Sequence, residues 1–353
     1  KNKVPFFIPE FTKDMENAAV DALKNETSVM GESVAKFEEE FARYIGTKYA
    51  ISVNSGNSAL QLSLLSLNIA EESKVITSTN SFIASANCIL MTGSKPILCD
   101  INYDDGNMDI KSTNEKPDAI IPVHIYGNPC DLESIKNVSE TYKVPIIEDA
   151  CQAHGAVYEQ KKVGSLGDVG CFSFYPTKNM TVCGDGGMVT TNNEETKNEI
   201  ESLRDNGRKT RTEHDKLGFT MRLNTVSAAI GRIQLQTLEN KNKRRREIAS
   251  LYKKFLNEDC MLSENPKGVS VYHQIVLKHK KRDEIFSHLS KNNIGIAIHY
   301  PIPIHRQPLY KNLGYNLPIS EKFSNEVVSL PSYPGLEDDD VKVVCEKINE
   351  VLI

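Results

Sequence analysis

The sequence predicts an α/β protein organised around a mostly parallel β-sheet. Its 353 residues correspond to about two domains of ordinary size, enough for a large buried core. From residue 49 onward, short runs rich in β-branched residues alternate with longer amphipathic segments, which is the rhythm of successive βαβ units. The strand-like runs are Tyr49–Asn54, Lys74–Thr77, Lys95–Ile101, Ala119–Val123, Val144–Glu148, Gly170–Phe174 and Met188–Thr190.

Helical patterns surround the first of these runs. Residues Ser58–Leu67 are apolar nearly all round, as expected of a helix packed against a sheet. Upstream, Ser33–Tyr44 carries apolar residues at helical spacing with acidic residues between them. We expect an amphipathic helix there.

The texture of the chain changes after about Thr225, where one long helical pattern begins. We expect a large domain of residues 1–240, whose N-terminal segment is able to pack on the other domain, and a small α+β domain of residues 241–353. The basic run Lys241–Arg246 falls at this boundary. It could contact phosphates, but flanking glutamates and the overall charge favour a solvated helix face.

Charge balance and hydropathy exclude several classes of function. The 42 Lys and Arg residues against 47 Asp and Glu residues give a net charge of −5, so no global positive field holds a nucleic acid or an anionic membrane. No apolar stretch is long enough for a transmembrane helix, and the first residues lack the long apolar core of a signal peptide. We therefore expect a soluble cytoplasmic protein without nucleic-acid or membrane partners.

The cysteines are scattered along the chain without a CxxC pair, several of them within apolar strand-like runs. This pattern favours free buried thiols in a reducing cytosol. Because a thiol-based metal site needs ligands clustered in the sequence or in space, we expect no metal.

The first candidate site follows the first predicted strand, where Asn54-Ser55-Gly56-Asn57-Ser58 forms a small polar turn before a helix. The N–H groups of such a turn can cradle a phosphate, with the Ser55 and Ser58 hydroxyls as further donors. Serine and asparagine also cap helices in many proteins, so the turn by itself is better explained as an ordinary helix start.

The second candidate site is the carboxyl end of the predicted strand Val144–Glu148, which runs directly into Asp149. Open α/β sheets bind their ligands at this end. A carboxylate placed there can keep a heteroaromatic nitrogen protonated or bind a metal. The alternative is a helix N-cap for the residues that follow, and the segment alone leaves both interpretations open.

The third candidate is Lys178, which a proline turn delivers after the strand-like run Gly170–Phe174 and which the glycine-rich loop Gly184–Gly187 follows. A lysine is normally a solvated surface cation. Here aromatic residues and glycines surround it in the sequence instead of other charges. Desolvation can therefore lower its pKa enough for the amine to act as a nucleophile.

Together the three candidate sites suit one cofactor. Pyridoxal 5′-phosphate (PLP) needs a phosphate anchor, a partner for its pyridinium nitrogen and an amine that forms a Schiff base. The polar turn, the carboxylate pair and Lys178 supply these groups in that chain order. The sequence therefore predicts a PLP enzyme.

Ordered motifs from Gly31 to the end of the chain carry a resemblance to a known family. The motifs are Phe37–Phe41, Val75–Thr77, Phe82–Asn87, Gly93–Pro96, Glu148–Ala150, Gln152–Gly155, Ser173–Asn179 and Gly184–Gly187. On these motifs the chain resembles the DegT/DnrJ/EryC1/StrS family of sugar aminotransferases, which are fold-type I PLP enzymes. The resemblance implies a large domain with a mostly parallel, mixed seven-stranded sheet flanked by helices, and a small C-terminal α+β domain.

The resemblance also implies roles for single residues. Lys178 is similar to the lysine that forms the internal aldimine and then moves the proton, and Asp149 resembles the partner of the pyridinium nitrogen. Gln152 is similar to the donor to the cofactor's phenolic oxygen, and Phe82 to the aromatic residue that stacks on the pyridine ring. The positions that match phosphate-binding residues are Gly56, Asn57, Ser58, Ser173 and, from the partner subunit, Arg222.

Two positions depart from the usual pattern of the family. Asn57 stands where threonine is common, and Thr220 replaces an asparagine often found two residues before Arg222, but both substitutes can still form hydrogen bonds. Members with histidine in place of the lysine are dehydratases, so Lys178 favours amino transfer. We expect His154 to be a structural hydrogen-bond donor beneath the cofactor.

The reaction implied by the resemblance is a ping-pong transamination from L-glutamate to a nucleotide-linked keto-sugar, with pyridoxamine 5′-phosphate as the intermediate form of the cofactor. The segment Ile298–Tyr310 resembles the branch that aminates C3 of 3-keto-6-deoxyhexoses, in amino-sugar biosynthesis for polysaccharides such as O-antigens. The resemblance also implies a homodimer with active sites at the interface. The candidate substrate contacts are His299, Tyr300, His305 and Arg306, although histidines in proline-rich connections are equally often structural.

Two other functions stay open at this point. A PLP-dependent sugar dehydratase, or another PLP enzyme of the same fold, would share the whole site. A non-catalytic regulator could use the cofactor pocket as a sensor and the run Lys241–Arg246 as a contact surface. The net negative charge speaks against that regulator, and DNA binding that weakens steeply with salt would favour it.

Overall fold

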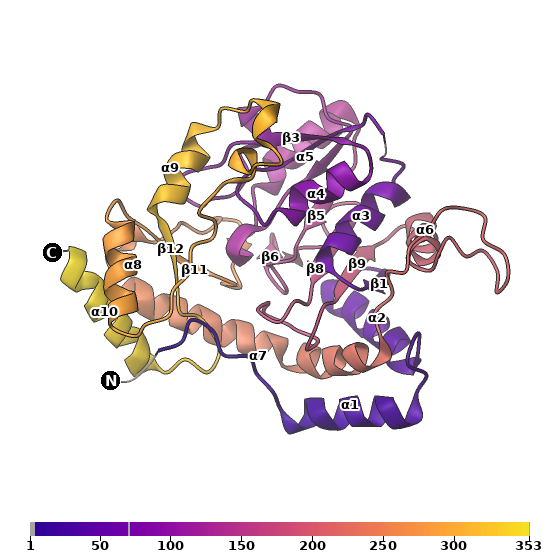
Figure 1. Cartoon of the computed structure of the whole chain (residues 1–353), viewed down its shortest axis with the longest axis horizontal. Coiled ribbons are helices and arrows are strands. Elements are labelled where there is room, and N and C mark those ends of the chain that lie inside the picture. Colours follow the sequence, from indigo (N-terminus) through magenta and orange to yellow (C-terminus); the bar gives the residue numbers. More distant parts are fainter. Residues whose placement is uncertain (1–3, 70, 353) are drawn as a thin grey trace.

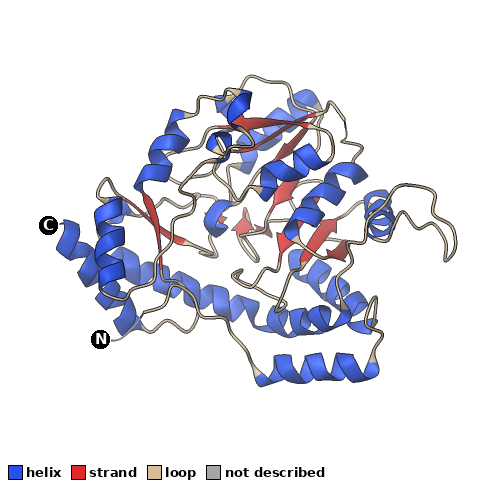
Figure 2. Ribbon diagram, viewed as in Figure 1, coloured by secondary structure: helices blue, strands red, loops and turns tan. Residues whose placement is uncertain are grey.

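The computed structural model describes residues 4–69 and 71–352, and it gathers the seven predicted strands into one central sheet (Figures 1 and 2). These strands are β1 (Tyr49–Val53), β2 (Lys74–Ser78), β3 (Lys95–Cys99), β4 (Ala119–Ile121), β5 (Ile147–Asp149), β8 (Val169–Ser173) and β9 (Gly187–Thr191). One part of the sheet has the order β1-β9-β8-β5 and the other the order β3-β2-β4. The bridges Ile120–Ile146 and Val123–Asp149 join the two parts.

The sheet is parallel except around β9. Strand β2 pairs in parallel with β3 and β4, and β5 pairs in parallel with β8. Strand β9 runs antiparallel to both β1 and β8. The connection from β8 to β9, residues 174–186, contains no helix, as an antiparallel pair allows, whereas parallel neighbours need a long crossover. The mostly parallel, mixed sheet implied by the resemblance is confirmed.

Helices cover both faces of the sheet. They are α2 (Glu32–Ile45), α3 (Gly56–Ser66), α4 (Ala84–Met91), α5 (Leu132–Tyr142) and α6 (Glu194–Arg204), with α1 (Lys13–Asn25) lying outside along α7 (Thr225–Phe255). Successive residues of β2 pack into different hydrophobic clusters. Ile76 belongs to the cluster that contains Phe41, and Val75 belongs to the cluster that contains Leu62. This alternation is the consequence of the two-residue period of a strand.

The two helices predicted in the first part of the chain are confirmed. The predicted helix Ser33–Tyr44 is α2, and the predicted helix Ser58–Leu67 is α3, which begins two residues earlier than expected, at Gly56. The N-cap explains the difference: the Ser55 hydroxyl accepts the N–H of Ser58, so the polar turn already belongs to the helix start.

The C-terminal part of the chain has a hydrophobic cluster of its own. It contains Ile248 and Tyr252 of α7 and, from the N-terminal segment, Val4, which bridges to Ile294. Its other elements are β11 (Ile275–Lys278), α8 (Arg282–Lys291), α9 (Pro318–Glu326), β12 (Val327–Leu330) and α10 (Asp338–Leu352), while β6 (Val157–Tyr158), β7 (Lys161–Lys162) and β10 (Gly268–Val269) form a small separate sheet. Helix α7 runs unbroken through residue 240, so the division at that residue stays a prediction.

The basic run Lys241–Arg246 does not form one solvated face. Arg245 is buried and donates to the backbone carbonyls of Tyr272 and Ser332. Lys241 pairs with Glu10, and Arg244 pairs with Asp338 at 2.7 Å. The predicted solvated face is therefore wrong for Arg245, because the long helix turns this side toward the C-terminal cluster.

Two further features concern the sequence predictions. Among residues 4–69 and 71–352, no helix has both the length and the apolar composition that crossing a bilayer requires. All of the cysteines are free thiols, and all except Cys151 and Cys183 are buried.

The aromatic cluster between α2 and the sheet should carry a large share of the stability. Phe41 is fully buried, and its ring lies 5.0 Å from that of Phe172 and 5.6 Å from that of Phe174. We expect Phe41→Ala to lower the free energy of unfolding by about 3–5 kcal/mol, because it leaves a cavity in a close-packed core. The half-exposed Leu313 provides the control: Leu313→Ala should change it by less than about 1 kcal/mol in urea unfolding. Equal losses for the two variants would contradict this account of the core.

Candidate active site

A cavity of about 520 Å³ lies where the chain leaves β1, β5 and β8. Polar segments that follow strand ends are the usual ligand-binding parts of an α/β sheet. The residues that line this cavity include Ser55, Gly56, Asn57, Ser81, Phe82, Ser85, Asp149, Cys151, Gln152, Ser173, Lys178, His273, His299 and Tyr300. The three candidate sites of the sequence thus meet in one cavity.

The polar turn after β1 forms the N-terminal end of α3. Its Ser58 hydroxyl donates to Asn54 at 2.6 Å, so Ser58 is buried and supports the turn, whereas Gly56 and Asn57 line the cavity. A Cβ atom on Gly56 would lie 2.7 Å from the Cβ of Ser173, so only glycine allows the turn to approach β8 this closely. The free N–H groups and the positive end of the helix suit an anion here.

Lys178 lines the cavity with its amine unpaired. Its backbone N–H donates to Tyr175, and the structure gives its side chain no hydrogen bond or ion pair within the described ranges. Burial lowers the pKa of Lys178, while the nearby Cys151 and Asp149 oppose that shift. A lysine with a lowered pKa supplies a larger neutral fraction, and the neutral amine is the nucleophilic form.

Asp149 and Gln152 follow β5 and face the same cavity. The carboxylate of Asp149 accepts the Ser85 hydroxyl at 2.7 Å and the N–H of Cys151 at 3.2 Å. The amide of Gln152 accepts the N–H of Tyr126 at 2.9 Å and donates to the Tyr300 hydroxyl at 3.2 Å. These bonds fix both side chains before any ligand binds, as a preorganised site requires.

Phe82 and Ser173 complete the group of predicted cofactor residues that line the cavity. Phe82 stands just before α4, and 58% of it is exposed. Its ring therefore has an uncovered surface that an aromatic ligand can use for stacking. Ser173 is the last residue of β8 and is buried.

His273 is a lining residue that sequence reasoning missed. Its Nδ1 lies 3.3 Å from the Asn179 side-chain oxygen, which can only accept, so Nδ1 is the donor in this contact. Burial and the nearby Lys178 hold the pKa of His273 well below its ordinary value, so the ring is neutral. No local pattern in the sequence indicates that His273 reaches the cavity, because its partner Asn179 is 94 residues away.

Two further histidines near Lys178 are also neutral. Burial and the neighbouring lysine lower the pKa of His299 to about 4 and that of His154 to about 3. His154 packs between Phe172 and Phe174. Neither of its ring nitrogens has a hydrogen bond that meets the usual geometric limits among the residues described, so the role of His154 as a structural donor stays a prediction.

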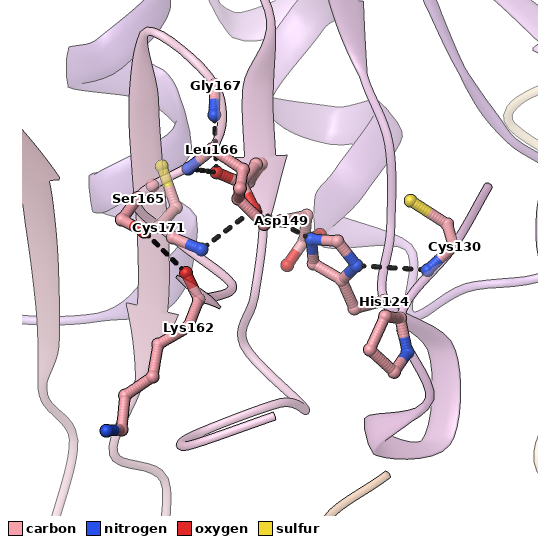
Figure 3. Close-up of polar contacts among 12 residues, drawn as sticks. His124, Cys130, Asp149, Lys162, Ser165, Leu166, Gly167 and Cys171 are labelled. Carbon is pink, nitrogen blue, oxygen red and sulfur yellow. Dashed lines mark hydrogen bonds and ion pairs between the residues drawn. The ribbon is translucent and has the colours of Figure 1, made fainter. Parts of the chain in front are cut away.

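Glu148, the other carboxylate of the predicted pair, is bound inside the protein. It accepts the N–H groups of Gly164, Leu166 and Gly167 at 2.6–2.8 Å and the Nε2 of His124 at 3.0 Å. Figure 3 draws this network, with His124 between its partner Cys130 and the turn that carries Leu166 and Gly167. Since Nδ1 of His124 accepts the Cys130 N–H, the ring proton lies on Nε2 and points at the carboxylate.

Three predicted site residues lie elsewhere in this subunit. Arg222 pairs with Asp205 at 2.8 Å and does not line the cavity. His305 is buried against Thr79 and Glu321, and the exposed Arg306 pairs with Glu321 at 2.7 Å. Of the predicted substrate contacts, only His299 and Tyr300 reach the cavity.

The residues present fit PLP. An unpaired lysine amine, a carboxylate with oriented oxygens, an uncovered aromatic ring and a helix N-terminus share one cavity, and these are the groups that the aldehyde, pyridine nitrogen, ring face and phosphate of PLP require. By contrast, the described residues contain no cluster of three His, Cys, Asp or Glu side chains arranged to hold a metal ion.

Comparison with protein families gives one clear result. The sequence model described as "DegT/DnrJ/EryC1/StrS aminotransferase family" matches residues 9–349 of the chain.

Similar proteins are known from sequence and from structure. A dTDP-3-amino-3,6-dideoxy-alpha-D-galactopyranose transaminase from Aneurinibacillus thermoaerophilus is 38% identical over 96% of this chain and 95% of its own. A pleiotropic regulatory protein from Geobacillus stearothermophilus is 36% identical over 94% of this chain and 92% of its own. The crystal structure of S. venezuelae DesV in complex with a ketimine intermediate superimposes with a TM-score of 0.96 at 33% identity, covering 99% of both chains.

The network around Glu148 generates a prediction on stability. Burial alone would raise the pKa of Glu148, but His124 and the backbone donors outweigh burial and lower it. In Glu148→Gln an amide N–H₂ would face N–H donors, so we expect a loss of about 3 kcal/mol in the free energy of unfolding near neutral pH. The exposed Glu140 provides a control, and Glu140→Gln should change this free energy by about 0.5 kcal/mol or less.

The loss of stability in Glu148→Gln relative to the wild type should become smaller at acidic pH. The Glu148 contribution is present above the ordinary pKa of 4.5 and disappears as the pH falls through the lowered value, because the wild-type carboxylate then takes up a proton. Urea unfolding measured from about pH 7 to about pH 3 should show the gap between wild type and Glu148→Gln narrowing. A gap that stays constant would contradict an ionised Glu148.

Proposed function

The chain belongs to the DegT/DnrJ/EryC1/StrS aminotransferase family and is a PLP-dependent transaminase, and we propose that it transfers the amino group of L-glutamate to a nucleotide-linked keto-sugar. The observation that carries this proposal is the unpaired amine of Lys178 in one cavity with the carboxylate of Asp149. A lysine rather than a histidine at this position is the feature that favours amino transfer over dehydration.

PLP is the proposed cofactor, and pyridoxamine 5′-phosphate would be its aminated form. When bound, PLP supplies the electron sink for removal of a proton from the carbon that carries the amino group. Lys178 would hold the cofactor through its amine, and the free neutral amine would move that proton. Asp149 accepts the hydrogen bond of the protonated ring nitrogen, and Gln152 donates to the phenolic oxygen with the amide hydrogen that Tyr300 leaves free.

The remaining cofactor contacts are proposed from the family resemblance, and the residues that line the cavity support them. Phe82 covers one face of the ring. Gly56, Asn57 and Ser173 bind the phosphate, with Ser58 holding the turn from behind. The proposed dimer supplies Arg222 from the partner subunit to this phosphate or to the substrate.

The proposed acceptor is a 3-keto-6-deoxyhexose on a nucleotide. The relative from A. thermoaerophilus supports this, because its name places the amino group at C3 of a 3,6-dideoxy sugar. His299 and Tyr300 are the proposed substrate contacts, since both line the cavity. The product would enter amino-sugar biosynthesis for a polysaccharide, and the cytoplasm is the proposed place of the reaction.

The name of one relative favours a second candidate function. Because a relative from G. stearothermophilus is named a pleiotropic regulatory protein, the second candidate is a regulator that uses its cofactor pocket as a sensor. The run Lys241–Arg246 gives little support, because Arg245 is buried and Lys241 and Arg244 are paired. An absorbance spectrum separates the functions: a transaminase converts the visible band of bound PLP to the pyridoxamine form when L-glutamate is added, whereas a sensor or a dehydratase leaves the band unchanged.

Replacement of Lys178 tests the cofactor attachment directly. We expect Lys178→Ala to remove covalent attachment and amino transfer while keeping the fold, because the residue lines a cavity and holds no other side chain. After borohydride reduction, mass spectrometry should detect the cofactor adduct on the wild type and none on the variant. Equal melting temperatures of the variant and the wild type would confirm that the fold is intact. Amino transfer by the variant would contradict the proposed role of Lys178.

Mixed dimers test the contribution of Arg222. In a two-fold dimer whose sites each use Lys178 of one subunit and Arg222 of the other, a hybrid of Lys178→Ala and Arg222→Ala subunits contains one site with both residues intact. We therefore expect two inactive homodimers to regain activity when their subunits are mixed and exchanged. If Arg222 acts in its own subunit, every site of the hybrid carries a defect and no activity returns.

A further inference from the structure

We propose that Ser85, held in place by Ser81, is a positioning residue that orients the carboxylate of Asp149 toward the cofactor's ring nitrogen. The inference rests on the proposed function, because it assigns a task within the same cavity. The juxtaposition that carries it is a continuous chain of three buried oxygen-bearing side chains that ends at Asp149.

The geometry of the chain is tight. The Ser81 and Ser85 hydroxyl oxygens lie 2.7 Å apart, and Ser85 lies 2.7 Å from Oδ2 of Asp149. All three residues are buried, with 5%, 1% and 4% of their surfaces exposed, respectively. All three also line the cavity, so the chain follows its wall directly.

The direction of the protons is fixed by the chemistry of the groups. A carboxylate that pairs with a pyridinium nitrogen carries no proton and can only accept. Ser85 must therefore donate its single hydroxyl proton to Asp149, which obliges Ser81 to donate to Ser85. Donation from Ser81 polarises the Ser85 hydroxyl and strengthens its bond to the carboxylate.

The remaining bonds of Asp149 show why one hydroxyl can decide its orientation. Its backbone is anchored on both sides, since its N–H donates to Pro122 at 2.8 Å and its carbonyl accepts the N–H of His124 at 3.1 Å. Among the described residues, its side chain accepts hydrogen bonds from the N–H of Cys151 on Oδ1 and from the Ser85 hydroxyl on Oδ2. Without Ser85, one oxygen loses its partner and the carboxylate can rotate about its own side chain.

The chain also connects two walls of the cavity. Ser81 and Ser85 lie on either side of Phe82 in the sequence, in the segment at the start of α4. Phe82 is the residue proposed to cover the ring face. The contact with Asp149 therefore fixes this segment against the end of β5. One hydrogen-bond chain thus sets the position of the ring partner and of the stacking residue together.

The test uses the holoenzyme and its PLP equilibrium. We expect Ser85→Ala to weaken PLP binding about ten- to a hundredfold, the effect of removing one hydrogen bond to a charged group. Ser81→Ala should weaken it less, because Ser85 keeps its own proton for Asp149. Ser85→Thr should restore binding, since it returns the hydroxyl. The control Ser63→Ala removes a hydroxyl that is equally buried but donates to Ala59 in α3, and it should leave PLP affinity within about twofold of the wild type.

A second measurement separates positioning from general destabilisation. With isotope-labelled PLP, the chemical shift of the ring nitrogen reports its protonation, and we expect Ser85→Ala to move it toward the neutral pyridine value while the melting temperature of each variant reports folding. If Ser85→Ala matches the wild type in affinity and in nitrogen shift, the inference is wrong while the proposed function stands. If the wild type itself binds no PLP, both fail.

Discussion

The arrangement of the site depends on two adjacent carboxylates at the end of β5 that serve opposite sides of the strand. Because strand side chains alternate, Glu148 enters the interior and Asp149 enters the cavity. A buried carboxylate without partners would cost several kcal/mol, so Glu148 is stable there only with its four donors. Those donors come from the turn before β8 and from His124 after β4. Satisfying Glu148 therefore ties together the strands on both sides of β5 and fixes the point from which Asp149 extends.

The same burial shapes the electrostatics of the cavity. His154, His273 and His299 all lie near Lys178, and burial keeps each of them neutral. The lowered pKa of Lys178 has the same cause, as desolvation disfavours the ammonium. The protein thus surrounds the amine of Lys178 with imidazole rings that add no positive charge. Within one subunit, the attraction for an anion comes from backbone N–H groups at the start of α3, which cannot titrate.

The sequence was sufficient where a local pattern determines structure. The strand runs follow from β-branched composition, α2 and α3 from their periodicity, and the positions of Asp149 and Lys178 from strand ends that converge at one edge. It was insufficient where the other half of an interaction lies far along the chain. Nothing near Arg245 indicates that its carbonyl partners lie at Tyr272 and Ser332. For the same reason the local strand pattern could not distinguish the buried Glu148 from the cavity-facing Asp149, and only the family resemblance singled out Asp149.

In the proline-rich segment, the resemblance identified candidate substrate contacts by position in the sequence, but it did not determine which of them reach the cavity. His299, Tyr300, His305 and Arg306 lie within eight positions of each other, yet only the first two reach the cavity. Two anchors explain the divergence. The Tyr126 hydroxyl donates to the carbonyl of His299 at 2.5 Å, next to the bond from Gln152 to Tyr300, so the first pair is fixed at the cofactor wall.

The second pair is drawn in the opposite direction. Thr79 and Glu321 occupy both ring nitrogens of His305, and Glu321 also binds Arg306, so both side chains are directed toward Glu321 and neither lines the cavity. Both halves of the segment carry the residue types expected of a sugar site. The hydrogen-bond partners determine which half can act as a sugar site. A side chain that already forms a buried hydrogen bond would have to break that bond before it could bind a ligand.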